Sequence, residues 1–363
     1  MITEILYERP ITMETARRAV FGGAVLGGGG GGEIEEGLAM ARLALELGQP
    51  RVLAPDALSD EAVLVTVSAV GSPAASEQFV KPIDYVDALD LLRQHLDVEI
   101  GGLITNENGG LATINGWLQS AITGLPVVDC PCNGRAHPTG LMGAMGLDGV
   151  QGYLSRQAAV GGDPSNGRRV RLYVEGRLAH AARLVRQAAV EAGGLVGVAR
   201  NPVTVAYARK YGAPGALAQA VTVGQALLSA PDPERAAQAV ANVLGGRIVA
   251  RARVRTVELV TRDGFDVGMV CLDDGLELTF WNEYMTLERA GERIATFPDL
   301  ITTLAADEAR PLSSAGITEG REVFVLHVPR AHLHLGEGMR RPELLRAAEE
   351  AVGRPLVPFV FPE

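Results

Sequence analysis

The chain has 363 residues, of which 47% are hydrophobic and 21% are charged, and its formal net charge is −10. Such values are typical of a globular protein that buries a full core without disulfides, and the length suggests two domains. The negative charge argues against nucleic acid as a partner, because it would repel a phosphate backbone.

The cysteine count and the N-terminal residues indicate the compartment. Three cysteines are too few for a disulfide framework and fit a reducing environment. The first twenty residues carry Glu4, Glu8 and Glu14 and no apolar core, so we expect no secretory signal. No run of 18 apolar residues occurs, which predicts no membrane span and no membrane partner. We therefore predict a cytoplasmic protein.

The first half of the chain alternates between strand and helix patterns. Residues 22–48 read as a short apolar strand, a glycine run and a helix whose apolar residues recur at helical spacing. Valine-rich or apolar strands and one further helix follow, at 51–55, 62–73, 84–96 (the helix), 101–105 and 125–130. This alternation predicts an α/β N-terminal domain with a largely parallel sheet, over residues 1–165.

The second half has a different pattern. Helical periodicity is found at 175–194, 203–213, 216–230 and 233–246. Residues 247–288 then alternate between apolar and polar side chains, with Gly and Asp at the turns, and a strand at 321–329 and a helix at 342–353 follow. We predict an α+β C-terminal domain with antiparallel β structure, over residues 166–363, after a turn-forming segment at 161–169.

The run of six glycines, Gly27 to Gly32, is expected between a strand and a helix. Its backbone N–H groups either bind a small ligand, with Gly28, Gly29 and Gly30 as contacts, or the run is a passage where backbone approaches backbone. Acidic residues Glu33, Glu35 and Glu36 follow at once and would repel a pyrophosphate. We therefore expect a small neutral or singly charged ligand rather than a dinucleotide.

The segment "VVDCPCNGRAH", residues 127–137, is the densest in reactive side chains. Asp129 follows a predicted parallel strand, at the sheet edge where such folds bind ligands. Arg135 offers a bidentate partner for a carboxylate, unless it only pairs with Asp129. Asn133 is a further contact candidate.

Cys130 and Cys132 have three open interpretations. They are buried core residues, or nucleophiles activated by a nearby cation or histidine. Alternatively they bind a zinc ion together with His137, although a single residue between them is closer than structural zinc sites favour. The sequence itself requires no cofactor.

Polar side chains elsewhere are also candidates. Glu107 lies in "TNENGGL", where amides and a carboxylate surround a Gly-Gly pair. Asn282 and Glu283 lie in a strand within an aromatic run. Ser72 follows an apolar strand, where a helix start is the simpler interpretation.

In order along the chain, the stretches "GGAVLGGGGGGE", "VSAVGSPAASE", "ENGGL", "GLPVVDCPCNGRAHP", "GFDVGMV", "WNEYM" and "FPDLI" resemble the S-methyl-thiohydantoin desulfurase family. The resemblance implies a two-domain protein that releases methanethiol from an S-methylated thiohydantoin with an acidic side chain. The resemblance also implies which positions are functional, namely the glycine loop, Glu107, Asp129, Arg135, Asn282 and Glu283. Cys130, Cys132 and His137 depart from the family pattern.

We therefore predict a hydrolase-like enzyme acting on a small cyclic amide or its S-alkyl thio derivative. Asp129 or Glu107 is the expected base, Arg135 the anchor, and the glycine loop stabilises developing negative charge. Cys130 and Cys132 are second-rank nucleophile candidates. The competing prediction is a non-catalytic binding protein, or a partner subunit of a hydantoinase-type enzyme. In either case we expect a homo-oligomer, and the glycine bend and the acid–arginine segment should share one cleft.

Overall fold

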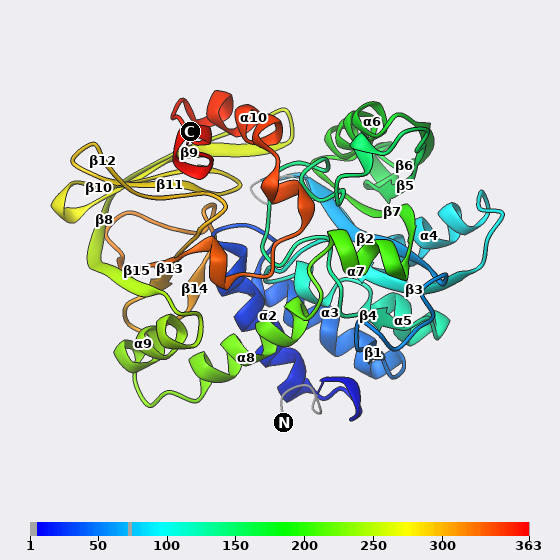
Figure 1. Cartoon of the computed structure of the whole chain (residues 1–363), viewed down its shortest axis with the longest axis horizontal. Coiled ribbons are helices and arrows are strands. Elements are labelled where there is room, and N and C mark those ends of the chain that lie inside the picture. Colours follow the sequence, from blue (N-terminus) through cyan, green and yellow to red (C-terminus); the bar gives the residue numbers. More distant parts are fainter. Residues whose placement is uncertain (1–5, 72–74, 363) are drawn as a thin grey trace.

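The computed structural model describes residues 6–71 and 75–362. Two β-sheets lie on opposite sides of a central group of helices (Figure 1). Among the described residues, no helix has the length and apolarity that crossing a bilayer requires.

The first sheet has seven strands in the order β1-β4-β3-β2-β7-β5-β6. Its strands, in that order, are Val52–Leu53, Val127–Val128, Ile100–Thr105, Val63–Gly71, Leu195–Thr204, Ser155–Gly161 and Val170–Gly176. The first four run parallel to one another, and the last three are added antiparallel. The parallel part lies in the N-terminal region, which confirms the predicted α/β organisation.

Alternate residues of β2 pack on opposite faces of this sheet. Val65 and Val67 join the core under α4 (Pro82–Arg93), α3 (Ile34–Leu47) and α5 (Trp117–Thr123). Leu64 faces the other way, towards α7 (Val205–Tyr211). Near the end of the strand, Val70 packs under α6 (Leu178–Glu191). A strand covered on both faces explains the continuous run of apolar residues in its sequence.

The predicted domain boundary near residue 165 falls between β5 and β6. These strands pair along their whole lengths, and β7 lies beside β5. The first sheet therefore continues past residue 165, and a boundary at that position stays a prediction.

The second sheet is antiparallel, with eight strands in the order β12-β11-β10-β9-β8-β15-β13-β14. In chain order, β8 to β15 are Arg247–Arg262, Phe265–Leu272, Leu276–Trp281, Glu283–Arg289, Glu292–Thr296, Leu300–Ala305, Pro311–Leu312 and Glu322–Val328. Helix α9 (Pro233–Val243) covers one face, and α10 (Pro342–Val352) and α11 (Val357–Val360) pack near β10 and β11. This sheet confirms the antiparallel structure predicted from the period-two pattern.

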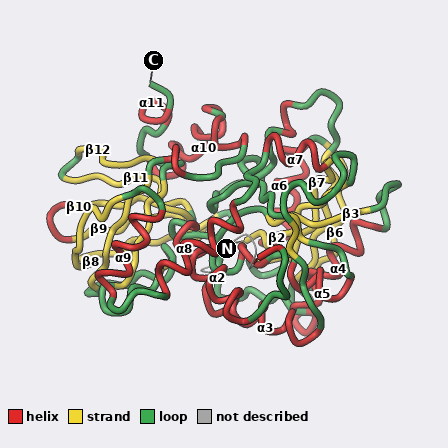
Figure 2. Tube along the Cα trace, turned by 60° about the horizontal axis from the view of Figure 1, so that its bottom comes forward, coloured by secondary structure: helices red, strands yellow, loops and turns green. Residues whose placement is uncertain are grey.

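The molecule has two halves, each built on one of the two sheets. Helices α2 (Met13–Gly27) and α8 (Ala216–Leu228) join these halves and lie side by side between the sheets (Figure 2). Val20 packs in the core of the first sheet and Leu26 in that of the second. At the crossing, a Cβ built on Gly22 would lie 1.8 Å from the Ala220 carbonyl oxygen, so only glycine fits there.

Helix α2 corrects one prediction, because residues 22–27 form its last turns and not a strand. Its start is set by Thr12, whose Oγ1 accepts a hydrogen bond from the Thr15 N–H at 3.2 Å. Gly22 permits the contact with α8, and Gly23 permits the close approach of Thr113 and Gly109. These tertiary reasons are not contained in the local pattern of the sequence.

Candidate active site

The glycine run connects α2 to α3, and its carbonyl groups are bound to both halves of the molecule. The Gly28 oxygen accepts from Tyr284 N–H and the Gly29 oxygen from Ser314 N–H, both at 2.8 Å. The Gly31 oxygen accepts from the N–H groups of Leu111 and Ala112. These bonds make the run a close backbone passage, as in the second interpretation, and a ligand contact from its N–H groups stays a prediction. Gly28, Gly29 and Gly30 do not line the central cavity, whereas Gly31 and Gly32 do.

A cavity with about 790 Å³ of empty space, part of it open solvent, lies where the two halves meet. Its charged lining residues among those described are Glu36, Glu107, Glu283, Arg186 and Arg200. The polar ones include Ser68, Asn106, Asn115, His137, Thr139 and Asn282. This mixture of donors and acceptors suits a small polar ring.

Glu107 is held by a chain of hydrogen bonds at the end of β3. Its Oε2 lies 3.0 Å from His137 Nδ1 and accepts from the Asn106 side chain at 3.1 Å and the His137 N–H at 3.3 Å. Asn106 also reaches His137 Nε2 at 3.1 Å, and its oxygen accepts from Arg200 at 2.9 Å. The Glu107 side chain is 14% exposed, so this carboxylate is both oriented and accessible.

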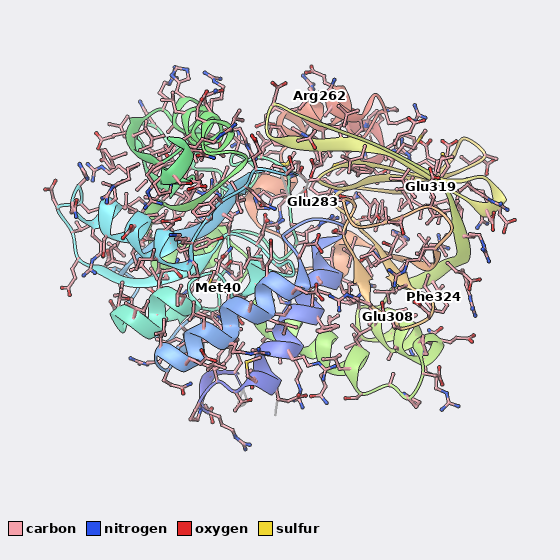
Figure 3. The ribbon with its side chains drawn as sticks, turned by 180° about the vertical axis from the view of Figure 1, so that it is seen from behind. Met40, Arg262, Glu283, Glu308, Glu319 and Phe324 are labelled. Atoms are coloured by element: carbon pink, nitrogen blue, oxygen red, sulfur yellow. The ribbon has the colours of Figure 1, made fainter. Side chains whose placement is uncertain are left out.

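Glu283 enters the same cavity from the start of β11 in the other half of the molecule. Figure 3 shows it near the middle of the molecule, between the two halves. Burial, and then the charge of Glu107, raise the pKa of Glu283 well above its usual value. Its Oε2 has no hydrogen-bond partner among the described residues. Two carboxyl groups in different environments therefore face one cavity, which is the arrangement of an acid and a base.

Two arginines, the buried Arg200 and the half-buried Arg186, line the same cavity and carry the charge opposite to that of the carboxyl groups. Arg200 donates to Asn106, and its Nε has no partner among the described residues. Arg186 donates to the backbone oxygens of Gly71, Gly264 and Pro138. Neither arginine has a carboxylate within ion-pair distance among the described residues, and burial lowers the pKa of both. A buried guanidinium without such a partner favours an anionic ligand.

Asp129 lies elsewhere. It is fully buried and accepts hydrogen bonds from Leu217 N–H at 2.7 Å, Ala218 N–H at 2.9 Å and the Tyr7 hydroxyl at 2.6 Å. The first two are free N–H groups at the start of α8, so Asp129 holds that helix terminus. It does not line the cavity.

Arg135 and Asn133 also lie beside the cavity rather than in its lining. Arg135 is fully buried, donates to the Pro298 and Asp299 oxygens, and stacks 4.5 Å from the Phe297 ring centroid. Burial lowers its pKa to about 10. Asn133 accepts from Gly336 N–H at 3.0 Å and donates to the Arg135 oxygen at 2.8 Å. Both side chains tie the segment at 130–137 to the C-terminal half.

Cys130 and Cys132 are buried in the apolar core beside α7. Burial raises the pKa of both thiols, that of Cys132 to about 11, which disfavours the thiolate that a nucleophile or metal ligand needs. His137 points to Glu107 instead of the cysteines. Within the described ranges, no three His, Cys, Asp or Glu side chains gather as metal ligands. The structure thus places these cysteines as core residues.

The remaining candidates divide between the cavity and other positions. Asn282 lines the cavity, at a tight turn between β10 and β11 with φ of 56°, a conformation that asparagine tolerates well. Ser72, like Glu4, lies outside the described residues.

Sequence reasoning missed Arg186 and Arg200. A usable signal was present in "VGVARNPV", where an arginine interrupts a buried apolar strand. A charged residue in such a position requires a partner or a ligand.

Comparisons with known proteins agree with this architecture. A crystal structure of a protein from Chromobacterium violaceum matches with a TM-score of 0.73 and 22% identity, covering 96% of this chain and 99% of that one. At this identity the likeness concerns the fold alone. No curated protein matches the sequence. Residues 15–163 match the S-Me-THD-like N-terminal domain and residues 177–340 the S-Me-THD-like C-terminal domain. Because these two models together cover most of the chain, the protein belongs to the S-Me-THD-like family.

Proposed function

We propose that this protein hydrolyses an S-alkyl thiohydantoin, or a closely related five-membered cyclic amide, in the cavity between its two halves. Glu107 acts as the general base on a water molecule, and Glu283 acts as the general acid. Arg200 binds a carboxylate on the substrate. The observation that carries the proposal is the presence of Glu107 and Glu283, in contrasting environments, in one cavity with unpaired arginines.

The chemistry balances with these two carboxyl groups alone. Glu107 takes a proton from water while the water oxygen bonds to the ring carbon between the two nitrogens. At the same time, Glu283 gives its proton to the adjacent ring nitrogen. The carbon–sulfur bond then breaks. The new hydroxyl returns a proton to Glu283, while the leaving thiolate takes the proton held by Glu107. Water is consumed, a thiol and a hydantoin are formed, and both carboxyl groups return to their starting states.

Arg200 replaces Arg135 as the proposed anchor. Both are buried and each has an unused donor, Arg135 Nη2 and Arg200 Nε, but only Arg200 lines the cavity. A carboxylate placed there would satisfy this donor and compensate the buried charge. The polar atoms of Ser68 and Asn282 add contacts for the ring from β2 and from the β10–β11 turn.

The test is a pair of S-methyl thiohydantoins that differ only in whether the side chain ends in a carboxylate or a neutral amide. We expect methanethiol release from the acidic compound, with one oxygen from labelled water in the ring product. Arg200→Gln should lose most of the preference for the acidic compound. Glu107→Gln should lower kcat by roughly 10²- to 10⁴-fold.

A different outcome would point to the competing function. Binding of both compounds, detected as a rise in melting temperature, without any thiol or ring product would identify a binding protein or partner subunit. Unchanged turnover in Glu107→Gln would exclude this residue as the base.

A further inference from the structure

The two polar side-chain atoms of Asn106 have well-defined partners. Asn106 is buried, with 6% of its surface exposed, at the end of β3. Its oxygen accepts from Arg200 Nη2 at 2.9 Å. Because a guanidinium only donates, this contact determines which end of the amide is the oxygen. The amide nitrogen must then face His137 and Glu107.

The orientation of this amide determines where His137 carries its proton. The Asn106 amide nitrogen lies 3.1 Å from His137 Nε2. An amide nitrogen only donates, so Nε2 must be the unprotonated acceptor and the ring proton must sit on Nδ1. His137 Nδ1 lies 3.0 Å from Glu107 Oε2, where a proton completes a hydrogen bond to the carboxylate.

We infer that Asn106 is a positioning residue that selects the Nδ1–H tautomer of His137 and thereby orients Glu107 towards the cavity. Three donors then converge on Glu107 Oε2, which are the Asn106 amide, the His137 N–H and His137 Nδ1–H. This leaves the other carboxylate oxygen available for a water molecule. The tautomer follows from the contacts alone, whereas its consequence for catalysis rests on the proposed function.

The test begins with the wild-type protein. Ring nitrogens of ¹⁵N-histidine are observed by NMR at mildly alkaline pH, where an ordinary histidine ring is neutral. The His137 signals are assigned by their loss in His137→Gln, or by elimination through single replacements of the other five of the six histidines. We expect a proton on Nδ1 and none on Nε2. A proton on Nε2 would overturn the inference without any variant of Asn106.

The informative variant is Asn106→Asp. A carboxylate only accepts hydrogen bonds, so Nε2 must gain a proton, whether by a change of tautomer or by double protonation. Asn115→Asp is the matched control, because Asn115 is equally buried at 6% exposure and lines the same cavity. No hydrogen bond joins it to His137 in the described part of the chain. In Asn115→Asp, the ¹⁵N signals of His137 should be those of the wild type. An unprotonated Nε2 in Asn106→Asp would contradict the inference.

Turnover provides the second readout. With a substrate identified as above, Asn106→Asp should lower kcat on the order of 10²-fold, as expected for a misplaced catalytic group. KM for an acidic substrate should rise as well, because the new carboxylate would face Arg200, the proposed anchor. If Nε2 is protonated in Asn106→Asp but kcat is unchanged, Asn106 selects the wild-type tautomer of His137 but has no positioning role in catalysis. If no thiohydantoin is turned over by the wild type, the NMR result still decides the tautomer, so the two failures are distinguishable.

Discussion

Gly30 lies directly against the carboxyl group of Glu283. A Cβ built on Gly30 would lie 1.9 Å from Glu283 Oε1 and 2.6 Å from its carboxyl carbon. Unlike its neighbours Gly29 and Gly31, Gly30 does not have a positive φ. The absence of a side chain, rather than an unusual backbone conformation, is therefore what this position requires.

We predict that Gly30→Ala displaces Glu283 and lowers kcat at least tenfold, because even small displacements of a catalytic group are costly. Gly176→Ala is the matched control. Gly176 also has no positive φ, and a Cβ there would meet nothing within 4 Å. Steady-state kinetics of both variants measure the effect on turnover, and their melting temperatures measure any effect on stability. Wild-type kcat in Gly30→Ala would show that the position of Glu283 does not matter.

The raised pKa of Glu283 should also make the stability of the folded protein depend on pH. Burial raises its pKa in the folded protein above the ordinary value that it has in the unfolded chain. The folded state therefore binds this proton more tightly, and stability falls as pH rises between the two pKa values. Glu283→Gln mimics the protonated form and removes this loss. As pH rises above the ordinary pKa range of a glutamate, its free energy of unfolding should decline less than that of the wild type.

Urea unfolding at several pH values measures this difference. The exposed carboxylate variant Glu319→Gln should keep the wild-type slope, since its charge is in solvent. Because the proposed general acid is lost, Glu283→Gln should also lower kcat by roughly 10²- to 10⁴-fold. Parallel pH slopes for wild type and Glu283→Gln would mean that Glu283 is ionised in the folded protein at neutral pH.

The sequence predicted the sheets better than the cavity. Period-two alternation over 247–288 and the apolar run of β2 both reflect how side chains alternate along a strand, so local pattern was sufficient. Glu107 is close to where strand-end reasoning expects it, just after β3. The same reasoning places Asp129 after β4, but its side chain turns to the N-terminus of α8, which is 88 residues away in sequence.

The arginines of the cavity show a second limit. Arg186 comes from α6 and Arg200 from β7, an antiparallel strand added to the parallel ones. Neither element follows the rule for ligand sites at parallel strand ends. Their convergence is a product of sheet topology, which residue spacing alone does not specify.

Asp129 should matter for stability and not for binding. Asp129→Asn keeps the size of the side chain but places an amide nitrogen against at least one of its three donors. We expect a loss of about 1–3 kcal/mol in the free energy of unfolding, as for an unsatisfied buried group. Urea unfolding measures this loss, and steady-state kinetics of the folded variant with the acidic thiohydantoin should give kcat and KM close to those of the wild type. A variant of normal stability without turnover would restore Asp129 as a candidate base.

Arg186 holds the β8–β9 turn against the cavity wall. It joins the end of β2, the segment after His137 and the β8–β9 turn, and it stacks 4.2 Å from the Phe265 ring centroid. Burial lowers its pKa to about 10, so the guanidinium remains charged at neutral pH. Phe265 is next to Asp266, whose backbone N–H donates to Asn282 Oδ1 at 2.9 Å in the cavity wall. The β8–β9 turn and the cavity wall are therefore one connected unit.

We predict that Arg186→Gln loosens this turn, because a glutamine cannot reach all three carbonyl groups. Loss of a charged hydrogen bond of about 1.5 kcal/mol corresponds to roughly tenfold faster local exchange. Hydrogen–deuterium exchange of peptides spanning 262–266 measures the effect. Arg183→Gln, on the exposed side of the same helix, is the control and should leave that peptide unchanged. Equal protection of the turn in both variants would mean that Phe265 and the strand pairing hold it closed without Arg186.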